Sequence, residues 1–67
     1  MTVADRLREL RLKNGWTQRE LAIRADVARI TICKYEAGKS KPKLDKLLRF
    51  SMVFGVSIAE LLREDAP

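Results

Sequence analysis

The chain has 67 residues, with 14 Lys or Arg against 9 Asp or Glu, and its formal net charge at pH 7 is +5. So short a chain buries only about 60% of its unfolded surface, which predicts a single small domain over residues 1–67. One cysteine and no histidine exclude an internal disulfide and an adequate set of zinc ligands, so we expect no metal and no cofactor. The excess of cations favours an anionic partner.

We expect neither a membrane span nor a secretory signal in this sequence. Its longest uncharged stretch, Phe50–Ala59, is too short to cross a bilayer. Charges alternate from Asp5 to Glu9, where a signal peptide would be apolar. We therefore expect a cytoplasmic protein without membrane contact. An enzyme is the weakest hypothesis, because without His no nucleophile, base and orienting group can be assembled.

The first predicted helix begins after Thr2 and ends at the stop signal Asn14-Gly15. Thr2 and Asp5 have the spacing of a weak capping box. The expected inner stripe consists of Val3, Ala4, Leu7 and Leu10. The cations of this helix are Arg6, Arg8, Arg11 and Lys13, and solvation is the expected state for most of them. Trp16, which follows, is predicted to belong to the core because of its large apolar surface.

Residues 17–36 are predicted to form two short helices joined by a tight turn. Thr17 and Glu20 have the S/T-x-x-E spacing of a capping box, so the first of these helices should begin at Gln18. Its inner stripe is Leu21, Ala22 and Ala25. Asp26 and Val27 form the turn, since Asp tolerates a left-handed backbone better than most residues other than Gly.

The second of these helices should run from about Ala28 to Ala37, with Gly38 in the left-handed position that ends it. If Ile32 points inward and each residue turns about 100°, Ala28 and Tyr35 share its side. The outward positions are Ile30, Lys34 and Ala37, flanked by Arg29 and Cys33. Such a short face, partly basic and partly apolar, suits DNA base edges and phosphates better than plain solvation.

This pattern resembles the helix-turn-helix of the Cro/C1-type (XRE-like) repressor family. The matching residues are Leu7, TQxELA at 17–22, I-x-x-YE-x-G at 32–38, Pro42 and GVS-x-x-x-LL at 55–62. The resemblance implies an all-α, compact five-helix fold of the lambda-repressor type, with the helix-turn-helix formed by helices 2 and 3. Two positions depart from the family: Asp26 replaces the usual Gly, and Ala28 replaces the usual Ser or Thr cap, a loss of about 1 kcal/mol.

The resemblance implies that the chain binds operator DNA with helix 3 in the major groove. Arg29 and Lys34 are then the candidates for guanine contacts, and Ile30 for a thymine methyl group. Residues predicted to contact the DNA backbone are Thr17, Gln18, Thr31, Lys39, Lys41 and Lys43, the lysines lying on a loop broken by Gly and Pro. In the family a cation at Arg11 pairs with the residue that matches Glu36, which implies a structural ion pair.

A fourth helix is predicted at Leu44–Phe54, closed by Gly55, and a short fifth helix follows the capping pair Ser57 and Glu60. The core stripe of the fourth helix is predicted as Leu44, Leu47, Leu48, Phe50, Ser51 and Phe54. The fifth should use Ile58, Leu61 and Leu62, and order is expected over about residues 3–63.

Too many apolar residues occur in the last third of the chain for all of them to be buried. In the family, the last helix and the loop before it form a two-fold contact, so a symmetric homodimer through Met52, Val56, Ile58 and Ala59 is expected. The function predicted is a transcriptional regulator, a repressor, that binds an inverted-repeat operator. The alternative is an antitoxin or anti-repressor of the same fold that acts mainly through a protein partner.

Overall fold

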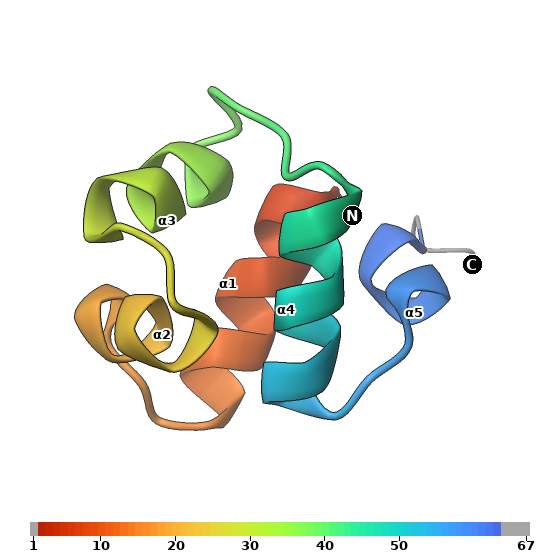
Figure 1. Ribbon diagram of the computed structural model, residues 1–67, viewed down its shortest axis with the longest axis horizontal. Helices are drawn as coiled ribbons and strands as arrows, with labels where there is room; N and C mark the ends of the chain where they lie inside the picture. The colour runs from red at the N-terminus through yellow and green to blue at the C-terminus, as the bar shows by residue number, and fades with distance from the viewer. Residues whose placement is uncertain (1, 64–67) are drawn as a thin grey trace.

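The computed structural model describes residues 2–63 and contains five α-helices, with no β-strand among those residues. The helices are α1 (Val3–Lys13), α2 (Gln18–Ala25), α3 (Arg29–Glu36), α4 (Leu44–Phe54) and α5 (Ile58–Leu62). In Figure 1, α1 and α4 cross at the centre, α2 and α3 lie on one side of them, and α5 lies on the other. The predicted all-α, five-helix architecture is confirmed.

Local signals start and stop the helices as expected. Thr2 and Thr17 form reciprocal capping boxes with Asp5 and Glu20, and the Ser57 hydroxyl accepts a hydrogen bond from the Glu60 N–H at 3.0 Å. These bonds satisfy backbone donors that the first turn of a helix leaves free. At the other end, α2 closes on Asp26 and α4 on Gly55, both left-handed. Gly38 is also left-handed, at φ +73°.

The core lies between the crossed pair and the three outer helices. Its fully buried large side chains are Leu7, Leu21, Ile32, Phe50 and Leu61, one from each helix. Tyr35 meets Phe50 edge to face, with ring centroids 6.0 Å apart. Trp16 is half-buried and stacks on Phe54 at 5.8 Å, with the Arg24 guanidinium 4.4 Å from its ring centroid. Trp16 thus packs on the core while one face carries a cation.

The predicted inner stripe of α4 is too wide. Leu47 and Phe50 are buried and Phe54 is partly buried, but Leu44 and Leu48 are 64% and 49% exposed. A period near 3.6 marks the direction of the apolar face but not how many degrees of it the neighbouring helices cover. The same correction applies to Leu62 of α5, which is 48% exposed although it was assigned to the apolar side.

Three further expectations need correction at the level of single residues. Helix α3 is shorter by one residue at each end than predicted, because Ala28 and Ala37 are its caps. Ala28 is exposed instead of sharing the inward side with Ile32, since a cap residue lacks helical backbone angles. Arg6, for which solvation was preferred, is only 7% exposed, and its Nη1 pairs with Glu9 Oε1 at 2.9 Å. A long side chain can lie along apolar surface in this way.

Across residues 2–63, no helix is both long enough and apolar enough to traverse a lipid bilayer.

Candidate nucleic-acid interface

Helix α3 turns one side into the core and presents the other to solvent. Ile32 and Tyr35 are 1% and 7% exposed. Arg29, Ile30 and Lys34 are all exposed, and Ile30 keeps 62% of its surface accessible. An exposed Ile between two cations, unsupported by other apolar residues of this helix, is unusual for a face that only meets water. The three candidate base-reading side chains therefore stand together on a free surface.

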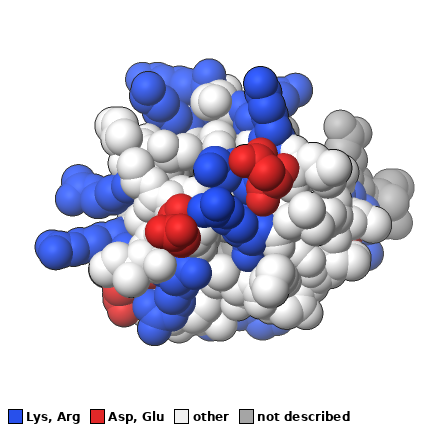
Figure 2. Space-filling view, in the orientation of Figure 1, with Lys and Arg blue, Asp and Glu red and all other residues white. Residues whose placement is uncertain are grey.

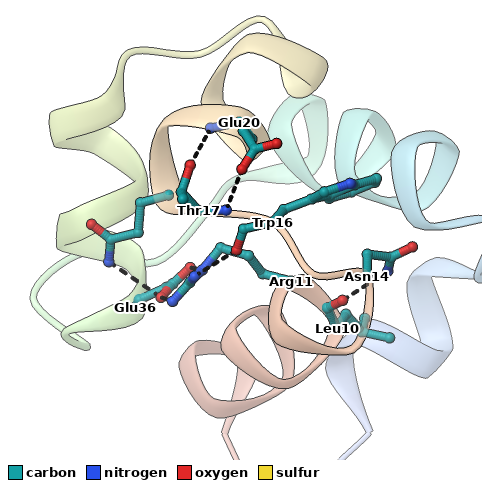
Figure 3. A network of polar contacts seen from close by, with 8 residues as sticks. Leu10, Arg11, Asn14, Trp16, Thr17, Glu20 and Glu36 are labelled. Atoms are coloured by element: carbon teal, nitrogen blue, oxygen red, sulfur yellow. Dashed lines mark hydrogen bonds and ion pairs between the residues drawn. The ribbon is translucent and has the colours of Figure 1, made fainter.

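A buried polar network locks α3 against α1 and α2. Arg11 Nε donates to Glu36 Oε2 at 2.7 Å, and Arg11 Nη2 donates to Glu36 Oε1 at 2.9 Å. A third guanidinium donor, Nη1, reaches the Trp16 carbonyl oxygen at 2.9 Å. The two charged side chains are only 11% and 5% exposed. Figure 3 shows Arg11 between Glu36 and the Trp16 backbone, so this one guanidinium joins the end of α3 to the corner between α1 and α2. The ion pair that the family resemblance implied is thus present.

Gln18, predicted to contact a phosphate, is drawn into the same network. Its amide Nε2 donates to Glu36 Oε1 at 3.3 Å, and the residue is half-buried. This contact holds the Gln18 side chain at the N-terminal end of α2, beside α3. The first-turn N–H groups and the positive end of the dipole of α2 meet there, and such a helix end attracts anions.

The two threonines proposed for backbone contacts, Thr17 and Thr31, differ in exposure. Thr17 is exposed, but its hydroxyl already accepts the Glu20 N–H, while the Thr17 N–H donates to Glu20 Oε1 at 3.0 Å. The bond from the Thr17 N–H is the main cause that lowers the pKa of the Glu20 carboxyl below its ordinary value. Thr31 is half-buried on the flank of α3. Thr17 thus serves the start of α2 first, and Thr31 offers only part of its surface.

The loop between α3 and α4 adds cations beside the free face of α3. Gly38 turns the chain, and Lys39, Lys41 and Lys43 are all exposed. In Figure 2, Lys and Arg side chains project in separate groups from the upper edge, where Figure 1 places α3 and this loop, and from the left edge, beside α3 and α2. Cations gathered in this way along one edge are the electrostatic footprint expected for a polyanion.

A hollow beside the C-terminal half of α3 has a volume of about 310 Å³ and is lined by Arg8, Arg11, Gln18, Cys33, Glu36 and Ala37. Cys33 is a free, exposed thiol. Within residues 2–63, no group of three or more His, Cys, Asp or Glu side chains is placed to hold a metal ion. This surface therefore carries cations, hydrogen-bonding groups, the exposed Cys33 thiol and the exposed Ile30 side chain.

One functional candidate escaped sequence reasoning. Arg49 of α4 reaches the turn between α2 and α3, where its Nη1 donates to the Asp26 carbonyl oxygen at 2.6 Å and lies 3.5 Å from Asp26 Oδ2. Nothing local in the sequence connects these two residues, which lie 23 positions apart.

Comparison with known proteins identifies the arrangement. A family model described as helix-turn-helix matches residues 7–61. The HTH-type transcriptional regulator ImmR of Bacillus subtilis is 35% identical over 65 residues, which are 97% of this chain but only 51% of that protein. The chain thus spans about half the length of this curated relative.

Solved structures agree on the architecture. The P22 c2 repressor, crystallised in complex with a synthetic operator, superposes with a TM-score of 0.89 at 26% identity and covers 97% of this chain and 98% of its own. The N-terminal DNA-binding domain of SinR from Bacillus subtilis gives a TM-score of 0.88 at 29% identity, covering 97% and 96%. The polar network, the exposed outer face of α3 and these matches together show that the chain belongs to the Cro/C1-type (XRE-like) helix-turn-helix family.

Proposed function

We propose that this chain is a sequence-specific DNA-binding transcriptional regulator, acting as a repressor, which inserts α3 into the major groove. The observation that carries the proposal is that Arg29, Ile30 and Lys34 are exposed side by side, while Ile32 and Tyr35 anchor the same helix in the core. The likeness to the P22 c2 repressor, whose structure holds a synthetic operator, supports this use of the fold.

Each exposed side chain of α3 has a distinct role in the proposal. Arg29, at the first helical position, offers a planar fork for the O6 and N7 acceptors of a guanine. Lys34 reaches a guanine acceptor or a phosphate as a single charge. Ile30 contributes no hydrogen bond and instead packs against a thymine methyl group.

Backbone contacts fix the register of the helix on the duplex. Gln18 and Thr17 present the N-terminal end of α2 to one phosphate, and Thr31 contributes from the flank of α3. Lys39, Lys41 and Lys43 form a second set beyond the end of α3. Because these groups release counterions without reading bases, affinity should fall steeply with salt.

We further propose that the chain binds as a homodimer to an inverted repeat whose half-sites lie about one helical turn, or about 34 Å, apart. Of the residues predicted for the interface, Met52 is 83% exposed and Ala59 is exposed. Val56 and Ile58 are half-buried and pack on the core of their own chain, so less of their surface is free. They contribute at the edge of the interface.

An exposed stripe of α4 supports a different centre for the proposed interface. Leu44, Leu48 and Met52 follow one another at every fourth position of α4, so they form an exposed apolar stripe. In Figure 2, the surface between α4 and α5, to the right of the central charged groups, shows few charged side chains. Contiguous apolar surface of this kind marks contact sites between proteins.

Selection of bound sequences from a random duplex pool, followed by anisotropy titration, tests the proposal. We expect one inverted-repeat motif. Arg29→Ala should flatten preference at one base position per half-site at a cost of about 1 to 3 kcal/mol. Lys41→Ala should weaken binding to all sequences alike and reduce the salt slope by about one. Arg63→Ala, which removes an equal charge just beyond α5, controls for net charge.

Two results would contradict the proposal. If the selection enriched no sequence at low salt, the protein would not bind DNA sequence-specifically and the whole proposal would be wrong. If Arg29→Ala bound every operator variant in unchanged ratios, the role given to that side chain would be wrong, even if the protein bound DNA.

A further inference from the structure

The turn that orients α3 is internally weak. Asp26 is the only residue other than Gly with positive φ among residues 2–63, at φ 56° and ψ 49°. A side chain in this left-handed region costs about 1 kcal/mol relative to Gly. Two residues later, the N-cap position of α3 is Ala28, which makes no side-chain hydrogen bond to the first turn. The Val27 N–H closes the α2 end of the turn by donating to the Ala22 carbonyl at 3.0 Å, but the α3 end lacks the side-chain cap that helix starts usually have.

A side chain from another helix supplies the missing support. Arg49 Nη1 donates to the Asp26 carbonyl oxygen at 2.6 Å and lies 3.5 Å from its carboxylate Oδ2. Among residues 2–63 no backbone N–H donates to this carbonyl, and the guanidinium satisfies it instead. Asp26 also forms an interaction with Arg49 that Gly could not form at this position, because only Asp offers the guanidinium a carboxylate.

The contact between Arg49 and Asp26 lies next to the helix proposed to read DNA. Asp26 precedes Arg29, the first residue of the reading helix, by three positions, and Arg49 lies on α4, which packs against α2. Arg49 follows Leu48, a member of the apolar stripe. Helix α4 therefore connects two features: the turn that orients α3, and the surface proposed to contact a second copy of the chain.

We propose that Arg49 is a positioning residue for DNA reading: its guanidinium clamps the turn at Asp26 and thereby sets the direction of Arg29 and Ile30. This inference rests on the proposed function for its consequence, but the clamp itself is testable without DNA. Because the Arg49 side chain is 43% exposed, its loss should loosen the turn without unfolding the domain.

Hydrogen exchange measured by NMR on the free protein tests the clamp. The amide of Val27 is bonded to the Ala22 carbonyl, and that of Ile32 to the Ala28 carbonyl. In Arg49→Gln, both should exchange about three- to tenfold faster, as expected for losing one partly exposed charge-assisted hydrogen bond. The Leu61 amide, in α5, should keep its rate. Arg63→Gln, with the same charge change, should alter neither turn amide.

Operator binding supplies the second measurement. Arg49→Gln should reduce discrimination at the base position assigned to Arg29 by about threefold or more, whereas Arg63→Gln should lower affinity only uniformly. Arg49→Lys should restore part of the discrimination, because an ammonium can still reach one oxygen. Unchanged turn exchange in Arg49→Gln would overturn the clamp, whatever the DNA result. Faster exchange with unchanged discrimination would overturn the positioning role. A wild-type protein that bound no DNA would refute the proposed function and leave the exchange result intact.

Discussion

The ion pair between Arg11 and Glu36 should dominate the stability of this domain. Replacing its two members one at a time is the sharpest test of the fold. The two side chains are 11% and 5% exposed and share two hydrogen bonds of 2.7 and 2.9 Å. Replacing one member leaves the other charged and buried without its ion-pair partner, which costs about 3 to 5 kcal/mol. At 0.05 to 0.15 kcal/mol per residue, the whole chain is stable by about 3 to 10 kcal/mol. Either single change should therefore remove a large part of the free energy of unfolding.

The double replacement should behave differently. With Arg11→Met and Glu36→Leu together, no charge is left buried, and apolar side chains of similar size fill the space. The Trp16 carbonyl and the Gln18 amide lose their partners, at about 1 kcal/mol each. The double variant should thus be more stable than the sum of the single losses predicts, by about 2 kcal/mol or more.

Urea unfolding, followed by far-UV circular dichroism and by Trp16 fluorescence, measures all four proteins of this cycle. Loss below about 1 kcal/mol in either single variant would place the pair in the class of solvated surface ion pairs. Losses that simply add in the double variant would refute the reasoning, because additivity means that the two charges do not depend on each other.

Three other predictions follow from local features. Met52→Glu should raise the dissociation constant of the homodimer about tenfold or more in sedimentation equilibrium, because like charges would meet across the two-fold axis. The control Ile23→Glu, at a residue of α2 that is 70% exposed, should leave association unchanged. If both changes weakened the homodimer equally, the apolar stripe would not belong to the interface. The hydrogen bond from the Thr17 N–H is the chief cause that lowers the pKa of Glu20 from 4.5, so the ionised carboxylate stabilises the fold above pH 4.5 and this stabilisation is lost as pH falls through the lower folded pKa. The urea midpoint of the wild type should therefore fall below pH 4.5, and Glu20→Gln should flatten that fall. An unchanged fall of the midpoint in Glu20→Gln would contradict this prediction. Ala28→Ser should stabilise the fold by about 1 kcal/mol in the same urea assay by capping α3, and a neutral or negative effect would show that the cap site is already satisfied.

Short-range features were predictable because their causes lie within four residues. The capping boxes at Thr2 and Thr17, the first residue of α2 and the left-handed Asp26 follow from spacing and backbone preference, and the structure confirms each. The side of α3 that carries Ile32 was also predictable, since one strongly apolar residue and a 3.6-residue period define a direction. The partner of Arg11 was different: it came from the family resemblance, not from the residues alone.

Sequence patterns did not predict how far each apolar face extends. Leu44 and Leu48 continue the spacing of the buried residues of α4, yet about half or more of each side chain stays exposed. The burial of Arg6 shows the reverse case, a cation covered because its helix face happens to be enclosed. Exposure depends on the crossing of other helices, and a helical period contains no information about that crossing.

The sequence by itself determined five helices, their approximate ends and the class of surface that α3 presents, because caps, glycines and apolar spacing act through neighbouring residues. Only the tertiary structure decided which polar groups meet. Glu36 accepts hydrogen bonds from Gln18, 18 positions away, and from Arg11, 25 positions away, and Asp26 accepts one from Arg49, 23 positions away. Those contacts require helices to be packed first, since hydrophobic burial brings the segments together and hydrogen bonds then select among the donors within reach.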